Sequence, residues 1–210
     1  MKPKDIETFF SRLAAARPSP KSELNYVNPY TLLVAVVLSA QMTDAGVNKA
    51  TAPLFKKVKT PKAMVALGEE NLKTYIKSIN LLNTKAKNLI ALSQILLDRF
   101  GGTVPQDRDA LESLPGVGRK TANVVLNVAF GQPTMAVDTH VFRVANRTGL
   151  AAGKTPLEVE EKLLKIVPEK WKVDAHHWLI LHGRYVCKAK KPDCATCIVR
   201  DLCAFKEKSA

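Results

Sequence analysis

Four cysteines gather near the end of the chain, where they could hold a metal. They are Cys187, Cys194, Cys197 and Cys203, with the spacing C-x6-C-x2-C-x5-C. Two disulfides would suit a secreted protein, but the first residues lack the apolar stretch of a secretory signal. In a reducing compartment, four thiolates this close together predict a metal site instead. The spacing alone leaves two occupants open, a zinc ion or an iron–sulfur cluster.

A glycine-rich turn followed by basic residues is the second feature with chemical meaning, and residues 114–122 read LPGVGRKTA. Gly116 and Gly118 can take positive φ and carry no Cβ, so the turn can press its backbone N–H groups against a phosphate. The N-terminus of the following helix adds partial positive charge, and Arg119 and Lys120 add formal charge. Such contacts grip a nucleic-acid backbone without reading its sequence. The alternative is an ordinary turn between two helices.

The net charge favours nucleic acid as the partner. Lysine and arginine total 32 and the acidic residues 19, so the formal charge is +13. Unpaired charge is not buried, so this excess must lie on the surface, where it attracts a polyanion. A basic surface kept for solubility is the alternative. A membrane is disfavoured, because the longest apolar run, Leu32–Leu38, has seven residues and a span needs roughly 20. We therefore expect a cytoplasmic protein.

Several segments together resemble one protein family. The turn resembles a helix-hairpin-helix, and residues 38–41 (LSAQ), 136–144 (AVDTHVFRV) and 177–184 (HWLILHGR) look like further signatures. With the cysteine tail, this pattern is similar to the endonuclease III family, the bifunctional DNA glycosylases of base-excision repair. The resemblance covers essentially the whole chain. It implies that the partner is double-stranded DNA with a damaged base, oxidised pyrimidines above all, or an abasic site.

The resemblance implies two catalytic residues. The family's nucleophile, a lysine that attacks the sugar C1′, falls on Lys120, and the alternative is a lysine that only binds phosphate. The family's aspartate falls on Asp138, where a carboxylate can stabilise the developing oxocarbenium charge. Asp138 is also a natural N-cap for the helix that follows, and both roles are compatible. A Schiff base on Lys120 would then allow β-elimination, which is the AP lyase activity.

The resemblance also implies residues that hold the nucleotide outside the duplex, because a stacked base is out of reach. The gap is filled by a glutamine and a leucine, which correspond to Gln41 and Leu81. The family often has glycine before this leucine; here Asn80 takes its place, and asparagine is the next-best residue for a left-handed turn. Leu82 is a second candidate for the intercalating leucine, and both leucines are alternatively ordinary core. Further DNA contacts are implied at Gly116, Val117, Gly118, Arg119, Thr121 and His140.

For the cysteine tail, the resemblance implies a [4Fe-4S] cluster with the four cysteines as its ligands. The loop would then act as a staple that presents basic residues to a phosphate backbone, namely Lys188, Lys190, Lys191 and Arg200. The alternative is a clasp that only stabilises the end of the chain. The four histidines have no metalloprotease spacing, so they are interpreted as core or DNA-facing side chains.

Three rival functions remain to be weighed. An adenine-excising mismatch glycosylase of the superfamily lacks the lysine and uses a glutamate in the early central helix. Here Lys120 is present and residues 34–38 contain no acid. A thymine-mismatch glycosylase, also monofunctional, would lack Lys120 as well. A non-enzymatic helix-hairpin-helix module would need neither Lys120 nor Asp138.

The elements that must position these residues read as helix after helix, so we expect an all-α protein of about ten helices. Helices are predicted to start at Asn28-Pro29, Thr43-Asp44 and Asn83-Thr84, and to span 107–113, 119–130, 139–147, 155–166 and 174–185. Pro53 should kink or end the helix that contains it. The resemblance implies two helical lobes flanking a DNA-binding cleft, 22–132 with the helix-hairpin-helix at about 107–130, and 1–21 with 133–210. We expect a monomer.

Overall fold

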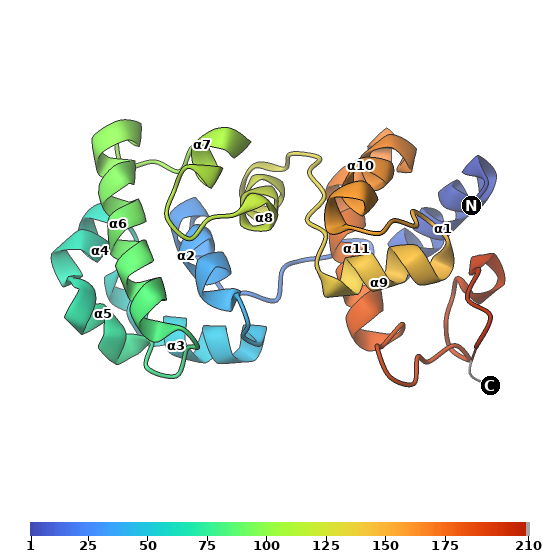
Figure 1. Cartoon of the computed structure of the whole chain (residues 1–210), viewed down its shortest axis with the longest axis horizontal. Helices are drawn as coiled ribbons and strands as arrows, with labels where there is room; N and C mark the ends of the chain where they lie inside the picture. The colour runs from blue at the N-terminus through green and yellow to red at the C-terminus, as the bar shows by residue number, and fades with distance from the viewer. Residues whose placement is uncertain (209–210) are drawn as a thin grey trace. The chain divides into compact units, whose positions relative to one another are not determined.

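The computed structural model describes residues 1–208, and all regular structure in this part of the chain is helical (Figure 1). This confirms the predicted all-α class. The α-helices are α1 Pro3–Ala16, α2 Pro29–Ser39, α3 Asp44–Lys57, α4 Pro61–Leu67, α5 Glu69–Tyr75, α6 Leu82–Phe100, α7 Arg108–Glu112, α8 Arg119–Phe130, α9 Thr139–Thr148, α10 Pro156–Ile166 and α11 Lys172–Tyr185. Two short 3-10 helices lie at Glu169–Trp171 and Arg200–Leu202.

The chain forms two compact units, and each is described by itself. The hairpin unit is Ser22–Gly131, and the cysteine unit joins Met1–Lys21 to Gln132–Ala210. Each unit has its own hydrophobic core. The lobe limits expected from the sequence differ from these bounds by one residue, Gln132.

Helix α2 is the centre of the hairpin unit. It begins after Asn28, whose side-chain oxygen accepts a hydrogen bond from Thr31 N at 2.9 Å, and Thr31 Oγ1 accepts one from Asn28 N at 3.0 Å. This capping box, with Pro29 at the first helical position, defines the start of the helix. Every residue from Tyr30 to Leu38 is buried. The helix packs against α3, α6 and α8, as Figure 1 shows.

The ends of three helices in the hairpin unit lie elsewhere than local sequence signals suggest. Helix α3 contains Pro53 and continues to Lys57, so of the two effects expected of this proline, ending the helix is excluded, because packing of the apolar face outweighs one lost hydrogen bond. Helix α5 ends at Tyr75, although the apolar spacing continues to Ile76 and Ile79. Helix α6 begins at Leu82, and its N-cap is Leu81 rather than Asn83. The turn between α5 and α6 is therefore longer than the apolar spacing suggested.

The cysteine unit is built around α9 and α11, which pack against each other, while α1 lies on α11 and α10 on α9. A close backbone approach joins the first pair. A Cβ built on Gly183 of α11 would lie 2.8 Å from the Cβ of His140 in α9, so only glycine fits there. Arg143 of α9 strengthens the contact, since its guanidinium donates to Gly183 O at 2.7 Å and to Cys187 O at 2.9 Å. The start of α9 is thereby tied to the start of the cysteine segment.

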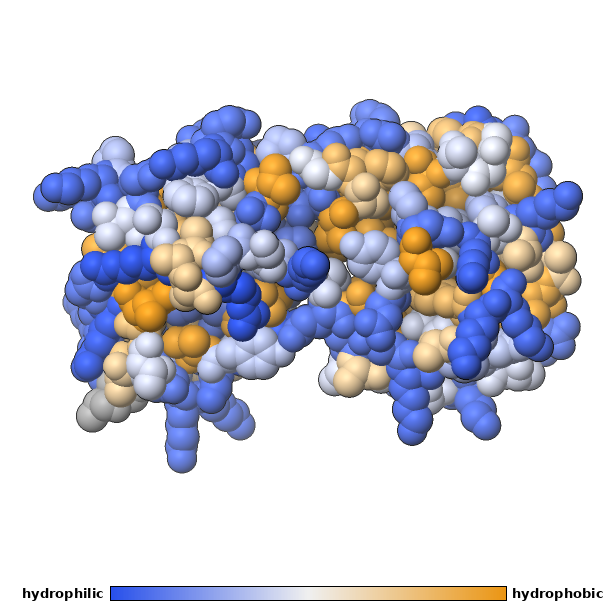
Figure 2. Space-filling view, turned by 180° about the vertical axis from the view of Figure 1, so that it is seen from behind, coloured by the Kyte–Doolittle hydropathy of each residue, from blue (hydrophilic) through white to orange (hydrophobic). Residues whose placement is uncertain are grey.

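Long hydrophilic side chains project from both units in the space-filling view (Figure 2), as a formal charge of +13 requires. Among the described residues, no helix has both the length and the apolarity that a membrane crossing needs.

Candidate DNA-binding and catalytic site

The glycine-rich turn joins α7 to α8 within the hairpin unit. Asp107 caps α7 by accepting a hydrogen bond from Ala110 N at 2.8 Å, and the turn closes through Val117 N and Leu114 O at 3.1 Å. Val117 is buried and anchors the turn, so its side chain faces the core while its backbone takes part in the turn. Gly118 is the N-cap of α8 and provides no side-chain cap. The first N–H groups of α8 therefore form an anion-binding helix terminus.

The two glycines of this turn differ in backbone conformation and in their surroundings. Gly116 has φ +78°, and a Cβ there would lie 2.8 Å from the amide nitrogen of Asn88 in α6. Gly118 has φ −99°, so it does not use the positive φ that glycine permits. A Cβ on Gly118 would meet nothing within 4 Å. Among the described residues nothing would clash with a side chain at 118, and its absence leaves the backbone of the turn open to close approach.

Lys120 occupies the second position of α8 and is exposed, so its amine can reach a bound molecule. Arg119 and Thr121 flank it and are half-buried. The structure therefore places one accessible primary amine directly beside the glycine-rich turn.

Asp138 is the N-cap of α9 in the cysteine unit, as the capping interpretation predicted. Its Oδ1 accepts hydrogen bonds from His140 N and Val141 N, each at 2.8 Å. Both bonds that the carboxylate makes within the described residues use Oδ1, so Oδ2 takes no part in the cap. His140 is half-buried, and its Nδ1 lies 3.1 Å from Arg143 Nη2. Lys120 and Asp138 belong to different units.

Gln41 and Leu81 lie on two turns of the hairpin unit and share an unusual backbone conformation. Their φ values are +59° and +58°, and with Lys191 they are the non-glycine residues of positive φ in the part of the chain that the structure describes. Leu81 is also 57% exposed, whereas Leu82 packs against the core. The expectation that Asn80 carries the left-handed conformation is wrong, because Leu81 does. A left-handed backbone at a non-glycine residue is an observation from which a functional role can be inferred.

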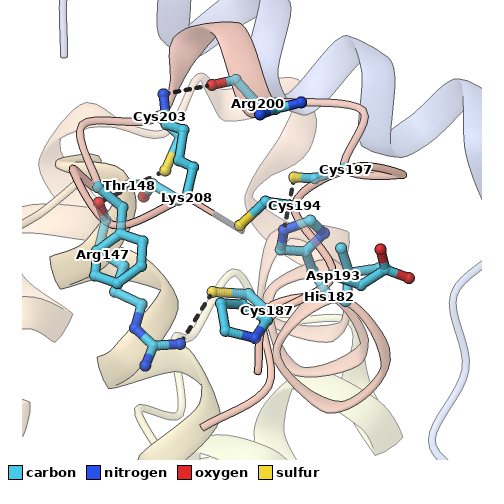
Figure 3. Close-up of a pocket in the computed structure, with 13 residues that line it drawn as sticks. Arg147, Thr148, His182, Cys187, Asp193, Cys194, Cys197, Arg200, Cys203 and Lys208 are labelled. Atoms are coloured by element: carbon cyan, nitrogen blue, oxygen red, sulfur yellow. Dashed lines mark hydrogen bonds between the residues drawn. The ribbon is translucent and has the colours of Figure 1, made fainter. Parts of the chain in front are cut away.

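The four cysteines of the tail line one cavity in the cysteine unit, as Figure 3 shows. Each thiol is partly exposed and free of disulfides. Burial raises the pKa of the Cys197 thiol, and the other cysteines add to this rise. A metal must displace these protons on binding, and four sulfurs around a shared space form the donor set that iron–sulfur clusters use. The four cysteines therefore fit an iron–sulfur cluster.

Two side chains support this cavity from outside the cysteine segment. Arg147 of α9 donates to Lys188 O at 2.6 Å and to Ala189 O at 2.9 Å, and its Nη1 lies 3.8 Å from Cys187 Sγ. Opposite it, Nε2 of His182 lies 3.7 Å from Cys197 Sγ (Figure 3). Burial lowers the pKa of His182 to about 4, so this imidazole is neutral near pH 7. The sequence gives no spacing signal for either residue.

Comparison with known proteins decides the family. Residues 34–169 match the model of the HhH-GPD superfamily of base excision DNA repair proteins, and residues 187–203 match the iron–sulfur binding domain of endonuclease III. Endonuclease III of Escherichia coli K12 is 62% identical over 198 residues, which cover 94% of each chain. The chain belongs to the endonuclease III family. It is therefore a DNA glycosylase of base-excision repair, and AP lyase activity is typical of this family.

Further relatives agree over the whole length of the chain. Endonuclease III of Haemophilus influenzae is 59% identical, with 99% of this chain and 98% of the relative covered. A solved endonuclease III–DNA covalent intermediate superposes with a TM-score of 0.90 at 47% identity and covers 97% of this chain and 96% of its own. Like other members of the endonuclease III family, this chain acts on DNA and carries a [4Fe-4S] cluster, so the zinc alternative is set aside.

Cluster ligation predicts a colour and a metal content. We expect purified protein to be yellow-brown and to contain iron, and Cys203→Ser to lose visible absorption and iron together. Its thermal midpoint should fall, because ligand loss removes metal-linked folding free energy. Iron analysis, the visible spectrum and thermal denaturation measure these effects. Thr196→Ser in the same loop serves as the control and should keep both, whereas stoichiometric zinc without iron would contradict the assignment.

Proposed function

We propose that this chain excises oxidised pyrimidines from duplex DNA and then cleaves the strand at the resulting abasic site. The observation that carries the proposal is the exposed amine of Lys120 on the first turn of α8, directly after the phosphate-binding turn. The turn grips the DNA backbone, so a nucleophile fixed to it is held at a constant distance from the sugar.

In the proposed reaction, the neutral amine of Lys120 attacks C1′ of the flipped nucleotide. The bond between C1′ and the base breaks, and the base leaves with the electron pair and takes up a proton. The sugar ring then opens to give a protonated Schiff base between Lys120 and C1′. This iminium acidifies the C2′ hydrogens, so loss of one proton expels the 3′ phosphate by β-elimination. Water then hydrolyses the imine and frees Lys120.

Asp138 would supply the negative charge for this sequence. Its Oδ2 can stabilise the positive charge that develops on the sugar as the base leaves, and it can exchange a proton with the amine. The two backbone N–H groups on Oδ1 support this role, because they fix the orientation of the carboxylate. The N-cap and the catalytic role are therefore served by different oxygens of one side chain.

Gln41 and Leu81 would hold the flipped state of the DNA. Leu81 is the exposed leucine of its turn, which favours it over Leu82 as the side chain that enters the base stack. His140 and the residues of the turn (Gly116, Val117, Gly118, Arg119 and Thr121) would bind phosphates. The four cysteines would ligate the cluster, which fixes the loop so that Lys188, Lys190, Lys191 and Arg200 can face the DNA backbone. We place this activity in the cytoplasm and assign it to a monomer.

An incision assay on duplex DNA tests the proposed function. Duplexes that carry thymine glycol should be cut with release of the base, and duplexes with an abasic site should be cut to a β-elimination end. An undamaged duplex should remain intact. Base release without strand cleavage would mark a monofunctional glycosylase, and DNA binding without either product would mark a non-enzymatic module.

The proposed role of Gln41 and Leu81 in filling the gap in the base stack, here called the wedge, predicts a loss of activity that depends on the substrate. Gln41→Ala and Leu81→Ala should slow excision from duplex DNA by about tenfold or more, because holding a nucleotide outside the stack costs a few kcal/mol. Cleavage of an abasic site in single-stranded DNA should be nearly unchanged. Single-turnover rates on both substrates measure this. Equal losses on both would contradict the wedge, and an effect confined to Leu82→Ala would move the role to Leu82.

A further inference from the structure

Gln41 and Leu81 are far apart in the sequence, but side chains from one short segment join their turns. Each residue is held in the left-handed region, which is unfavourable for a residue other than glycine. Such conformations persist only where the surrounding structure imposes them. The contacts that impose them here come from Asn80 and Lys85, which flank the start of α6.

Lys85 is a lysine in the core of the hairpin unit, and it is only 4% exposed. Its ammonium nitrogen donates to Leu38 O at 2.9 Å and to Ala40 O at 2.6 Å. These carbonyls lie at the C-terminal end of α2, immediately before Gln41, where the helix dipole favours a cation. The backbone of the same residue also holds the other turn, since Lys85 N donates to Leu81 O at 2.9 Å.

Asn80 forms the second link between the turns. Its side-chain nitrogen donates to Gln41 O at 2.9 Å, and its backbone N lies 3.4 Å from Met42 Sδ. The side chain of Asn80 therefore joins the residue before Leu81 to the carbonyl of Gln41 itself. A glycine at this position, as the family often has, could not make that bond.

The position of Lys85 is costly for stability alone. Its burial lowers the pKa of the amine, which reflects the cost of taking a charge out of water. Ala86, Leu89 and Leu92 lie on the same buried face of α6, where an apolar residue would be the usual choice. The buried ammonium group instead holds the carbonyls of Leu38 and Ala40. These carbonyls set the direction in which the chain enters Gln41.

We propose that Asn80 and Lys85 are positioning residues that couple the Gln41 turn to the Leu81 turn, so that the two side chains act on DNA as one rigid element. The proposal rests on the proposed wedge role of Gln41 and Leu81 and adds that neither residue works fully without the other. Neither Asn80 nor Lys85 needs to touch the reacting sugar. Their loss should weaken the flipped state and leave the covalent chemistry of Lys120 intact.

Two substitutions remove the hydrogen bonds of Asn80 and of Lys85 one at a time. Asn80→Ala removes an exposed side chain whose backbone φ is not positive, so folding should be undisturbed. Lys85→Met keeps the length of the buried chain and removes the donors. The matched controls are Asn83→Ala and Lys87→Met, which remove an exposed asparagine and an exposed lysine of α6.

The measurements are single-turnover excision from thymine-glycol duplex, cleavage of an abasic site in single-stranded DNA, and fluorescence of 2-aminopurine opposite an abasic analogue in a duplex. Asn80→Ala and Lys85→Met should each slow duplex excision by about tenfold and reduce the fluorescence rise that reports unstacking. Cleavage of the single strand should change less than about twofold, since it needs no wedge. Both controls should match the unaltered protein on all three measurements.

A double-mutant cycle tests the coupling itself. If the links act through Gln41 and Leu81, Asn80→Ala should have almost no further effect in a protein that already carries Gln41→Ala or Leu81→Ala. Fully multiplicative losses would overturn the coupling. If Lys85→Met fails to fold, as thermal denaturation would show, the cycle with Asn80→Ala decides alone. If Gln41→Ala and Leu81→Ala themselves leave duplex excision unchanged, it is the proposed wedge that fails.

Discussion

Lys120→Gln should abolish the borohydride-trapped adduct between this protein and DNA. Borohydride reduces an imine to a stable amine, so trapping reports the Schiff base directly. Incision of abasic DNA should fall by about a thousandfold or more, which corresponds to about 4 kcal/mol of transition-state stabilisation. In the unaltered protein, mass spectrometry of the trapped adduct should locate the DNA on Lys120.

The structure makes this substitution specific to the chemistry. Lys120 is exposed and glutamine is a good helix former, so α8 and the turn before it should keep their conformation. Much of the DNA affinity should remain, because the backbone N–H groups of the turn are untouched. Lys62→Gln, an exposed lysine of α4, removes the same charge and should trap as well as the unaltered protein. Full trapping by Lys120→Gln would mean that another amine is the nucleophile.

Asp138→Asn should reduce the turnover number by several powers of ten while leaving the fold intact. Asparagine caps helices about as well as aspartate, so its side-chain oxygen can still accept from His140 N and Val141 N. What disappears is the negative charge that opposes the positive charge of the transition state. A thousandfold loss would correspond to about 4 kcal/mol. Single-turnover excision rates and thermal midpoints give the two quantities separately.

Asp138→Ala provides the comparison that isolates the cap. It should lower stability by about 0.5–2 kcal/mol through loss of the capping bonds, in addition to removing the charge. If both variants lose activity and only Asp138→Ala loses stability, the carboxylate has a catalytic role apart from the cap. If Asp138→Asn is fully active, Asp138 serves only as the N-cap of α9.

Helix starts and the metal site could be predicted from the sequence alone, because both have local causes. Asn28 with Pro29, Asp107 and Asp138 begin helices because a short polar side chain satisfies N–H groups only two or three residues away. The cysteine spacing indicated a metal site for a similar reason, since ligands close in the chain must lie close in space. The family's motifs then favoured an iron–sulfur cluster over zinc, and the match at residues 187–203 confirmed this.

Other features depend on residues distant in the chain, so they could be recognised only in the folded protein. In α6, the apolar residues Ile90 and Leu97 are only half-buried, whereas the buried face includes Lys85. The sequence shows Lys85 among apolar positions of this helix, but its burial is explained only by its hydrogen bonds to Leu38 O and Ala40 O. Leu81, rather than Asn80, is left-handed because bonds from α6 and to the Gln41 turn fix its backbone. Local propensity ranks residues for a conformation, but long-range contacts decide which residue must adopt it.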